Sequence, residues 1–134
     1  MYQVRITRDD CRKGEAGDCF RCAAALAIQR ATRDDEANVY EDDFVTLIEV
    51  WGRHIVAPLR VREFVWAYDH LPRKADDRVV WPSELPAELK PFAFTLPDTD
   101  DPEWKERCYE CEHLFAPDEL DDEQTCSECR EVTA

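Results

Sequence analysis

The most informative residues are four cysteines near the C-terminus, arranged as two Cys-x2-Cys pairs, Cys108 with Cys111 and Cys126 with Cys129. A two-residue gap lets one tight turn direct two thiolates at a single ion, and a second such turn completes the tetrahedral shell that zinc prefers. A four-thiolate shell leaves no position for water or substrate, so the predicted zinc ion is structural rather than catalytic. The alternatives are two redox pairs, free cysteines, or a rubredoxin-like iron ion in place of zinc.

The segment that holds these cysteines, residues 104–134, contains few large apolar side chains. A piece of this size rarely builds a core without a staple, so we expect metal binding to supply its folding energy. Its pattern consists of Cys108, Cys111, Phe115, Leu120, Cys126, Cys129 and Arg130. On these residues the segment resembles small zinc modules of the zinc ribbon or treble-clef type. The resemblance implies a short helix at Ser127–Val132, and many such modules bind nucleic acid through basic residues.

The charge of the chain argues against that last role. The chain has 17 Lys and Arg against 31 Asp and Glu, a formal net charge of −14, and its C-terminal part is the most acidic. Nucleic-acid affinity depends largely on cationic side chains that displace counterions from phosphates, so general DNA or RNA binding is disfavoured. Two interpretations remain: the acidic residues form a solvated face, or they form a surface that engages a basic protein partner.

A third Cys-x2-Cys pair, Cys19 and Cys22, lies at the start of a predicted helix, and Cys11 precedes it. Three interpretations are open. Cys19 and Cys22 can simply pack in the core. All three cysteines can form a second zinc site, with His54 or His70 as the fourth ligand. Cys19 and Cys22 can form a thioredoxin-like redox pair, since a helix N-terminus lowers the pKa of a thiol.

Hydrophobic periodicity predicts two helices and four strands before the C-terminal cysteines. The predicted order is β-α-β-β-α-β, an α+β fold of the ferredoxin-like type in which two helices cover one face of an antiparallel sheet. The predicted elements are a strand at 2–8, a helix at 19–31 capped by Asp18, a strand at 44–51, a turn at 51–53, a strand at 54–57, a helix at 59–71 and a strand at 92–96.

These elements suggest an α+β domain over residues 1–96, a linker over 97–103 and a zinc-binding module over 104–134. A second resemblance rests on four segments: the Ala-rich stretch Gly17–Ile28, the Trp51-Gly52 turn, the helix Val61–Leu71 and the strand Pro91–Leu96. In these segments the N-terminal part is similar to small uncharacterised proteins of actinobacterial and phage genomes. This resemblance implies an origin and no particular activity.

The sequence offers no phosphate-binding Gly-rich loop and no nucleophile elbow, so we expect a protein that is not an enzyme. The expected function is that of an acidic zinc-binding interaction protein, a phage-type regulator that docks on a basic host protein surface. No apolar run is long enough to span a membrane and no secretory signal is evident, which predicts a cytoplasmic protein, in the host cytoplasm if phage-encoded.

Two alternatives belong to other functional classes. A thiol-disulfide oxidoreductase would use Cys19 and Cys22. A nucleic-acid-binding transcription regulator would use the basic N-terminal region, which contains Arg5, Arg8, Arg12, Lys13, Arg21, Arg30 and Arg33.

Overall fold

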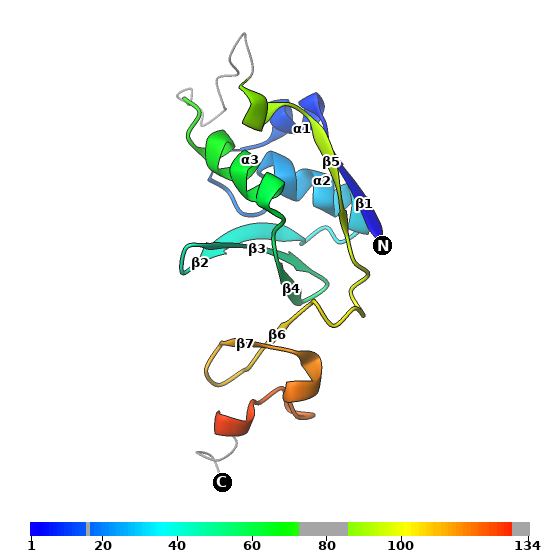
Figure 1. The fold of residues 1–134 in the computed structure, drawn as a ribbon, viewed down its shortest axis with the longest axis vertical. Coiled ribbons are helices and arrows are strands. Elements are labelled where there is room, and N and C mark those ends of the chain that lie inside the picture. The colour runs from blue at the N-terminus through cyan, green and yellow to red at the C-terminus, as the bar shows by residue number, and fades with distance from the viewer. Residues whose placement is uncertain (16, 73–85, 130–134) are drawn as a thin grey trace.

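The computed structural model describes residues 1–15, 17–72 and 86–129, and it confirms the α+β class (Figure 1). The helix predicted at Ser127–Val132 lies partly outside these residues, and Arg130 lies outside them altogether. The helices and strands are β1 (Tyr2–Ile6), α1 (Arg8–Lys13), α2 (Ala23–Thr32), β2 (Asn38–Asp42), β3 (Val45–Val50), β4 (Arg53–Val56), α3 (Leu59–Asp69), η1 (Ala87–Leu89), β5 (Phe92–Leu96), β6 (Glu106–Arg107), β7 (Leu114–Phe115) and η2 (Pro117–Glu119).

The strands of the described chain form three separate antiparallel sheets rather than one. β1 pairs with β5, β2 to β4 form a meander in the order β2-β3-β4, and β6 pairs with β7. A ferredoxin-like arrangement would join the first four predicted strands in a single sheet, and this arrangement is not confirmed. The free edge of β4 instead forms an antiparallel bridge between His54 and Lys105. At the opposite edge of the meander lies β2, which pairs with β3 and which the sequence analysis missed.

The start of α2 differs from the prediction by four residues. Cys22, not Asp18, is the N-cap, and its Sγ accepts a hydrogen bond from the backbone N–H of Ala25 at 3.4 Å. The Asp18 carboxylate accepts hydrogen bonds from the N–H groups of Phe20 and Arg21 in the turn before the helix. Asp18 therefore does stabilise a turn, as a short acidic side chain readily does, but the turn precedes the helix.

The hairpin between β3 and β4 follows the prediction. Trp51 and Gly52 have φ angles of 50° and 77°, so both lie in the left-handed region that a two-residue hairpin turn requires. Glycine adopts this conformation without strain, and Trp51 is carried outward with 57% of its surface exposed. The predicted strand at 92–96 is also confirmed, as β5.

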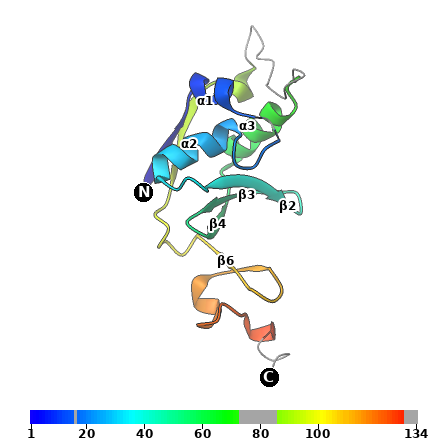
Figure 2. The ribbon, with the colours of Figure 1, turned by 180° about the vertical axis from the view of Figure 1, so that it is seen from behind.

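The hydrophobic core lies where α2 and α3 pack between the β1–β5 pair and the meander (Figures 1 and 2). Trp104 belongs to this core and is completely buried, although the sequence analysis placed it in the zinc-binding module. The division into a domain, a linker and a module stays a prediction. The largest fully buried side chains are Trp104, Tyr68, Phe64, Ile6, Ile28 and Ile48.

The β6–β7 hairpin and the following turns lie beyond the meander, on the side away from the helices (Figure 2). None of the helices in the described ranges combines the length and the apolar character needed to cross a bilayer.

Candidate metal centre

The four C-terminal cysteines come together in space. The Sγ atoms of Cys108, Cys111, Cys126 and Cys129 all lie within 4.8 Å of one another, and those of Cys111 and Cys126 are 3.8 Å apart. Four sulfurs placed about 2.3 Å from one zinc ion at tetrahedral angles would be separated by about 3.8 Å. The donor set and its spacing therefore fit one metal ion such as zinc.

The first cysteine pair is carried by the β6–β7 hairpin. Cys108 directly follows β6, and its N–H donates to the carbonyl of His113 at 3.0 Å. The N–H of Glu112 returns to the carbonyl of Cys108 at 2.9 Å, with Glu112 in the left-handed region at φ 62°. This tight turn explains why the two-residue gap brings Cys108 and Cys111 to the same point.

The second pair is held against the first by a bridge and a capped turn. Leu120 and Cys126 form an isolated antiparallel bridge, and the Asp121 carboxylate accepts a hydrogen bond from the N–H of Thr125 at 2.9 Å. Gln124 connects the two turns, because its backbone carbonyl accepts from the N–H of Tyr109 at 3.0 Å. Its side-chain Nε2 also donates to the carbonyl of Arg107 at 2.6 Å.

Backbone N–H groups favour the thiolate form of Cys108. Burial alone would raise the pKa of Cys108, but hydrogen bonds from the N–H groups of Cys111, Cys126 and Glu110 outweigh it and lower the pKa to about 6. The bond from the N–H of Cys126 measures 3.4 Å. The pKa of Cys129 is raised, first by its hydrogen bond with Cys126 and then by burial. The N–H groups that surround Cys108 thus favour the form in which sulfur ligates metals.

The N-terminal cysteines are not gathered in the same way. Cys11 on α1 and Cys22 at the start of α2 are buried, whereas Cys19 is exposed. Within the described ranges, the four C-terminal cysteines are the one set of three or more His, Cys, Asp or Glu side chains close enough to share an ion. The packing interpretation of Cys19 and Cys22 is confirmed for the buried Cys22 and is wrong for Cys19, which is exposed. A second metal site stays a prediction.

The two histidines considered for that second site have other partners. His54 lies in the meander, where Nδ1 is 2.7 Å from the Tyr40 hydroxyl and Nε2 is 3.3 Å from the Glu49 carboxylate. His70 ends α3 and directs its Nδ1 to the carbonyl of Trp66, at 2.6 Å.

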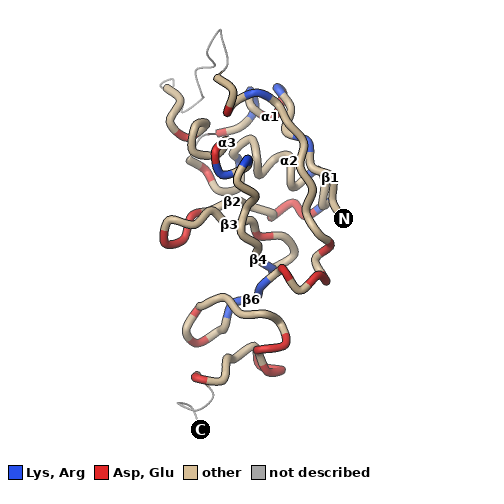
Figure 3. The backbone as a smooth tube through the Cα atoms, viewed as in Figure 1, with Lys and Arg blue, Asp and Glu red and all other residues tan. Residues whose placement is uncertain are grey.

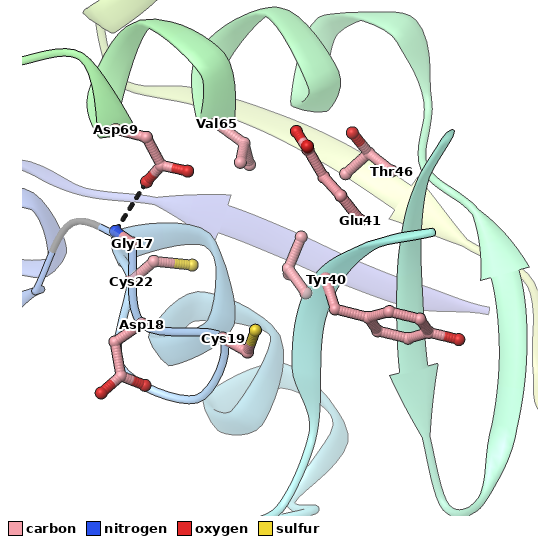
Figure 4. A pocket seen from close by; sticks show the side chains of 10 residues that line it. Gly17, Asp18, Cys19, Cys22, Tyr40, Glu41, Thr46, Val65 and Asp69 are labelled. Atoms are coloured by element: carbon pink, nitrogen blue, oxygen red, sulfur yellow. Dashed lines mark hydrogen bonds between the residues drawn. The ribbon is translucent and has the colours of Figure 1, made fainter. Parts of the chain in front are cut away.

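The predicted lowering of the thiol pKa at the start of α2 is wrong. Burial raises the pKa of Cys22 to about 12, and the hydrogen bond from Ala25 offsets only part of that effect. The pKa of Cys19 is raised by burial and by the nearby carboxylates of Asp18 and Asp69. The side chains of Cys19 and Cys22 and those of the two aspartates line a cavity of about 210 Å³ (Figure 4). Carboxylates beside a thiol oppose the helix dipole, so this pair lacks the electropositive surroundings of a redox centre.

Arg107 is a connecting residue that the sequence analysis missed. Its Nη2 donates to the Tyr40 hydroxyl at 2.5 Å and lies 3.4 Å from the Asp42 carboxylate, while Nη1 donates to the carbonyl of Glu112 at 2.7 Å. It therefore ties the cysteine-bearing hairpin to β2. No spacing rule could have found it, because its partners Tyr40 and Asp42 are more than 60 residues away in sequence.

The basic N-terminal residues are partly neutralised. Arg30 makes a two-pronged contact with the buried Asp10, with N–O distances of 2.7 and 2.9 Å, and Lys13 pairs with Asp9 at 2.9 Å.

Comparison of the chain with protein-family models, curated proteins and solved structures returned no match.

Proposed function

We propose that this chain is a zinc-binding protein in which one structural zinc ion, held by Cys108, Cys111, Cys126 and Cys129, organises its C-terminal module. The observation that carries the proposal is the clustering of the four Sγ atoms within 4.8 Å. Zinc suits an all-thiolate tetrahedral shell, and a closed shell of this kind stabilises a fold rather than catalysing a reaction. The binding energy of the metal replaces the core that the module lacks.

We further propose that the module presents an acidic surface to a basic partner protein, as expected of a phage-type regulator. Asp and Glu residues are spread along the C-terminal segment in Figure 3. The four thiolates around one zinc ion would add a formal charge of about −2 to this field. Such a surface accelerates association with a positively charged protein and repels phosphate backbones.

The test begins with the metal content of the purified chain. One zinc per chain is expected, and Cys111→Ser should reduce it to background while the exposed Cys19→Ser leaves it unchanged. Cobalt substitution should give the absorption of a tetrahedral thiolate site. A chain without metal, with four freely reactive thiols, would contradict the zinc site.

The docking role has its own measurement. The zinc-loaded chain should bind an immobilised oligolysine peptide in a salt-dependent manner and should not bind duplex DNA under the same conditions. DNA binding at low salt, lost on mutation of Arg8 and Arg12, would favour the nucleic-acid alternative instead.

A further inference from the structure

A groove lies between the meander and the β6–β7 hairpin. It encloses about 430 Å³ and is lined on one side by β2, β3 and β4, and on the other by the cysteine-bearing hairpin. The lining includes Cys111, so the groove directly adjoins the candidate metal centre. The face of the meander that forms this wall is the one turned away from the helices (Figure 2).

The floor of the groove is apolar. Val45, Leu47 and Val56 come from the meander, where Leu47 and Val56 are direct cross-strand partners, and Leu114 comes from β7. Leu47 is buried, whereas Val56 is 55% exposed and Val45 is 38% exposed, so the two valines leave apolar surface in contact with water on the floor of the groove. An apolar side chain inserted here would remove this surface from water.

The rim of the groove is acidic. Asp42 and Asp43 stand at the β2–β3 turn, and Glu112 stands opposite on the hairpin. Arg107 offsets one of these charges through its contact with Asp42. The carboxylates of Asp43 and Glu112 have no hydrogen-bond or ion-pair partner within the described residues, so two uncompensated negative charges flank the apolar floor. In Figure 3 the β2–β3 turn is red at its tip.

We propose that this groove binds an extended segment of a partner protein in which aliphatic residues alternate with Lys or Arg. The aliphatic side chains would fill the floor and the cations would pair with Asp43 and Glu112, as the alternation of a strand allows. The proposal rests on the proposed function, because it specifies where the acidic protein meets its basic partner. A second copy of this chain is a poor occupant, since each copy carries a formal charge of −14.

The metal should control this groove. One wall consists of Cys111, Glu112, His113 and Leu114, all within the hairpin that the cysteines organise. Loss of the metal would therefore remove the wall and one of the two unpaired carboxylates, while the meander would keep its own half of the groove.

The experiment uses the zinc-loaded full chain and an acetylated octapeptide of four Lys-Leu repeats, with four Glu-Leu repeats and octalysine as reference peptides. Affinity is measured by fluorescence anisotropy, and the contact site by methyl chemical shifts in NMR. The groove variant is Asp43→Lys with Glu112→Lys. The matched control is Asp35→Lys with Glu36→Lys, which makes the same charge change on exposed residues at the opposite end of β2.

We expect the Lys-Leu peptide to bind more tightly than octalysine, and the Glu-Leu peptide not to bind. The groove variant should weaken binding about tenfold, and the control about twofold or less, because close charge pairs matter more than net charge. Val56→Thr, which keeps the shape and the strand propensity, should weaken Lys-Leu binding and leave octalysine binding unchanged. The NMR signals of the Val45 and Val56 methyl groups should shift on addition of the peptide. This measurement uses the wild-type chain, so it does not depend on whether a variant folds.

Equal weakening by the two charge variants, or peptide-induced shifts confined to residues outside the groove, would overturn the groove and leave the proposed docking function intact. Absence of binding to any cationic peptide by a chain that holds one zinc would overturn both the groove and the docking function, while the zinc site would stand. The free chain could instead sediment as a dimer in which Val45 and Val56 are shielded from solvent. This result would show that a second copy of the chain occupies the groove, and it would also refute the proposal.

Discussion

The backbones of His54 and Lys105 exchange two hydrogen bonds, with N–O distances of 2.8 and 2.7 Å. This bridge attaches the segment that leads to the candidate metal centre to the edge of β4, and the buried Trp104 lies directly before it. The indole Nε1 of Trp104 donates to the carbonyl of Pro97 at 3.0 Å, which also fixes the segment from which the chain arrives. The path to the cysteines is therefore anchored in the main core, which belongs to the α+β part of the chain, the strands β1 to β5 with the helices α1 to α3.

Trp104→Ala should destabilise the α+β part, although residue 104 lies in the C-terminal quarter of the sequence. The variant removes a completely buried indole from the main core, a change that costs about 3–5 kcal/mol in typical proteins. The measurement is the free energy of unfolding from urea titration, followed by far-UV circular dichroism. Trp66→Ala is the matched control, because Trp66 is 61% exposed and should change stability by about 0.5 kcal/mol or less.

Cys111→Ser should release the zinc and unfold the cysteine-bearing segment, leaving the α+β part cooperative. The physical reason is that this segment contributes few buried apolar groups, whereas structural zinc supplies about 10–16 kcal/mol in small zinc peptides. In an NMR amide spectrum, the signals of residues 108–129 should collapse to random-coil positions while those of α2 and α3 stay dispersed. Complete unfolding would contradict the predicted division into two modules, and a native spectrum without zinc would contradict the role of the metal.

Asp10→Asn should cost about 2 kcal/mol and flatten the dependence of stability on pH. Burial raises the pKa of Asp10, but the hydrogen bonds from Arg30 and Thr7 outweigh it, so the folded-state pKa lies below that of the unfolded chain. The carboxylate therefore contributes its full stabilisation above the unfolded pKa of about 4, and this contribution is lost as the pH falls through the lower folded pKa.

Urea titrations between pH 3 and pH 7 test this expectation. The wild type should lose more stability than Asp10→Asn at the acid end. Asp9→Asn serves as the control, because the exposed pair of Asp9 with Lys13 contributes about 0.5 kcal/mol or less. If Asp10→Asn lost as much stability at low pH as the wild type, Asp10 would not be the titrating group.

The N-terminal thiols should react slowly with iodoacetamide at pH 8. Cys11 and Cys22 are buried, and burial raises the pKa of each to about 12, so both should be labelled only on unfolding. Cys19 is exposed and should be labelled first, but more slowly than an unstructured peptide thiol because its pKa is raised. Mass spectrometry of proteolytic fragments gives the order of labelling. Fast labelling of Cys22 in the native protein would support the thiol-disulfide oxidoreductase alternative.

Local patterns in the sequence predicted the local features. The spacing of Cys108, Cys111, Cys126 and Cys129 predicted a cluster, because two residues between cysteines suffice for one turn. The Trp51-Gly52 turn and the strand at 92–96 were predicted for similar reasons. The missed elements are short: α1 has six residues, and β2 ends in the acidic residues that usually mark loops. The start of α2 was misplaced because Asp18 caps the turn that precedes the helix, whereas Cys22 caps the helix itself.

Residue types and short spacings were enough to predict the α+β class, the acidic charge and the cluster of four cysteines. Only the folded chain shows that the described strands separate into three sheets, that Trp104 belongs to the main core and that Arg107 joins the β6–β7 hairpin to Tyr40. The β1–β5 pairing, the His54–Lys105 bridge and the hydrogen bond between Arg107 and Tyr40 each join residues more than 40 positions apart. Such contacts form by packing of complementary surfaces, and no periodicity along the chain encodes them.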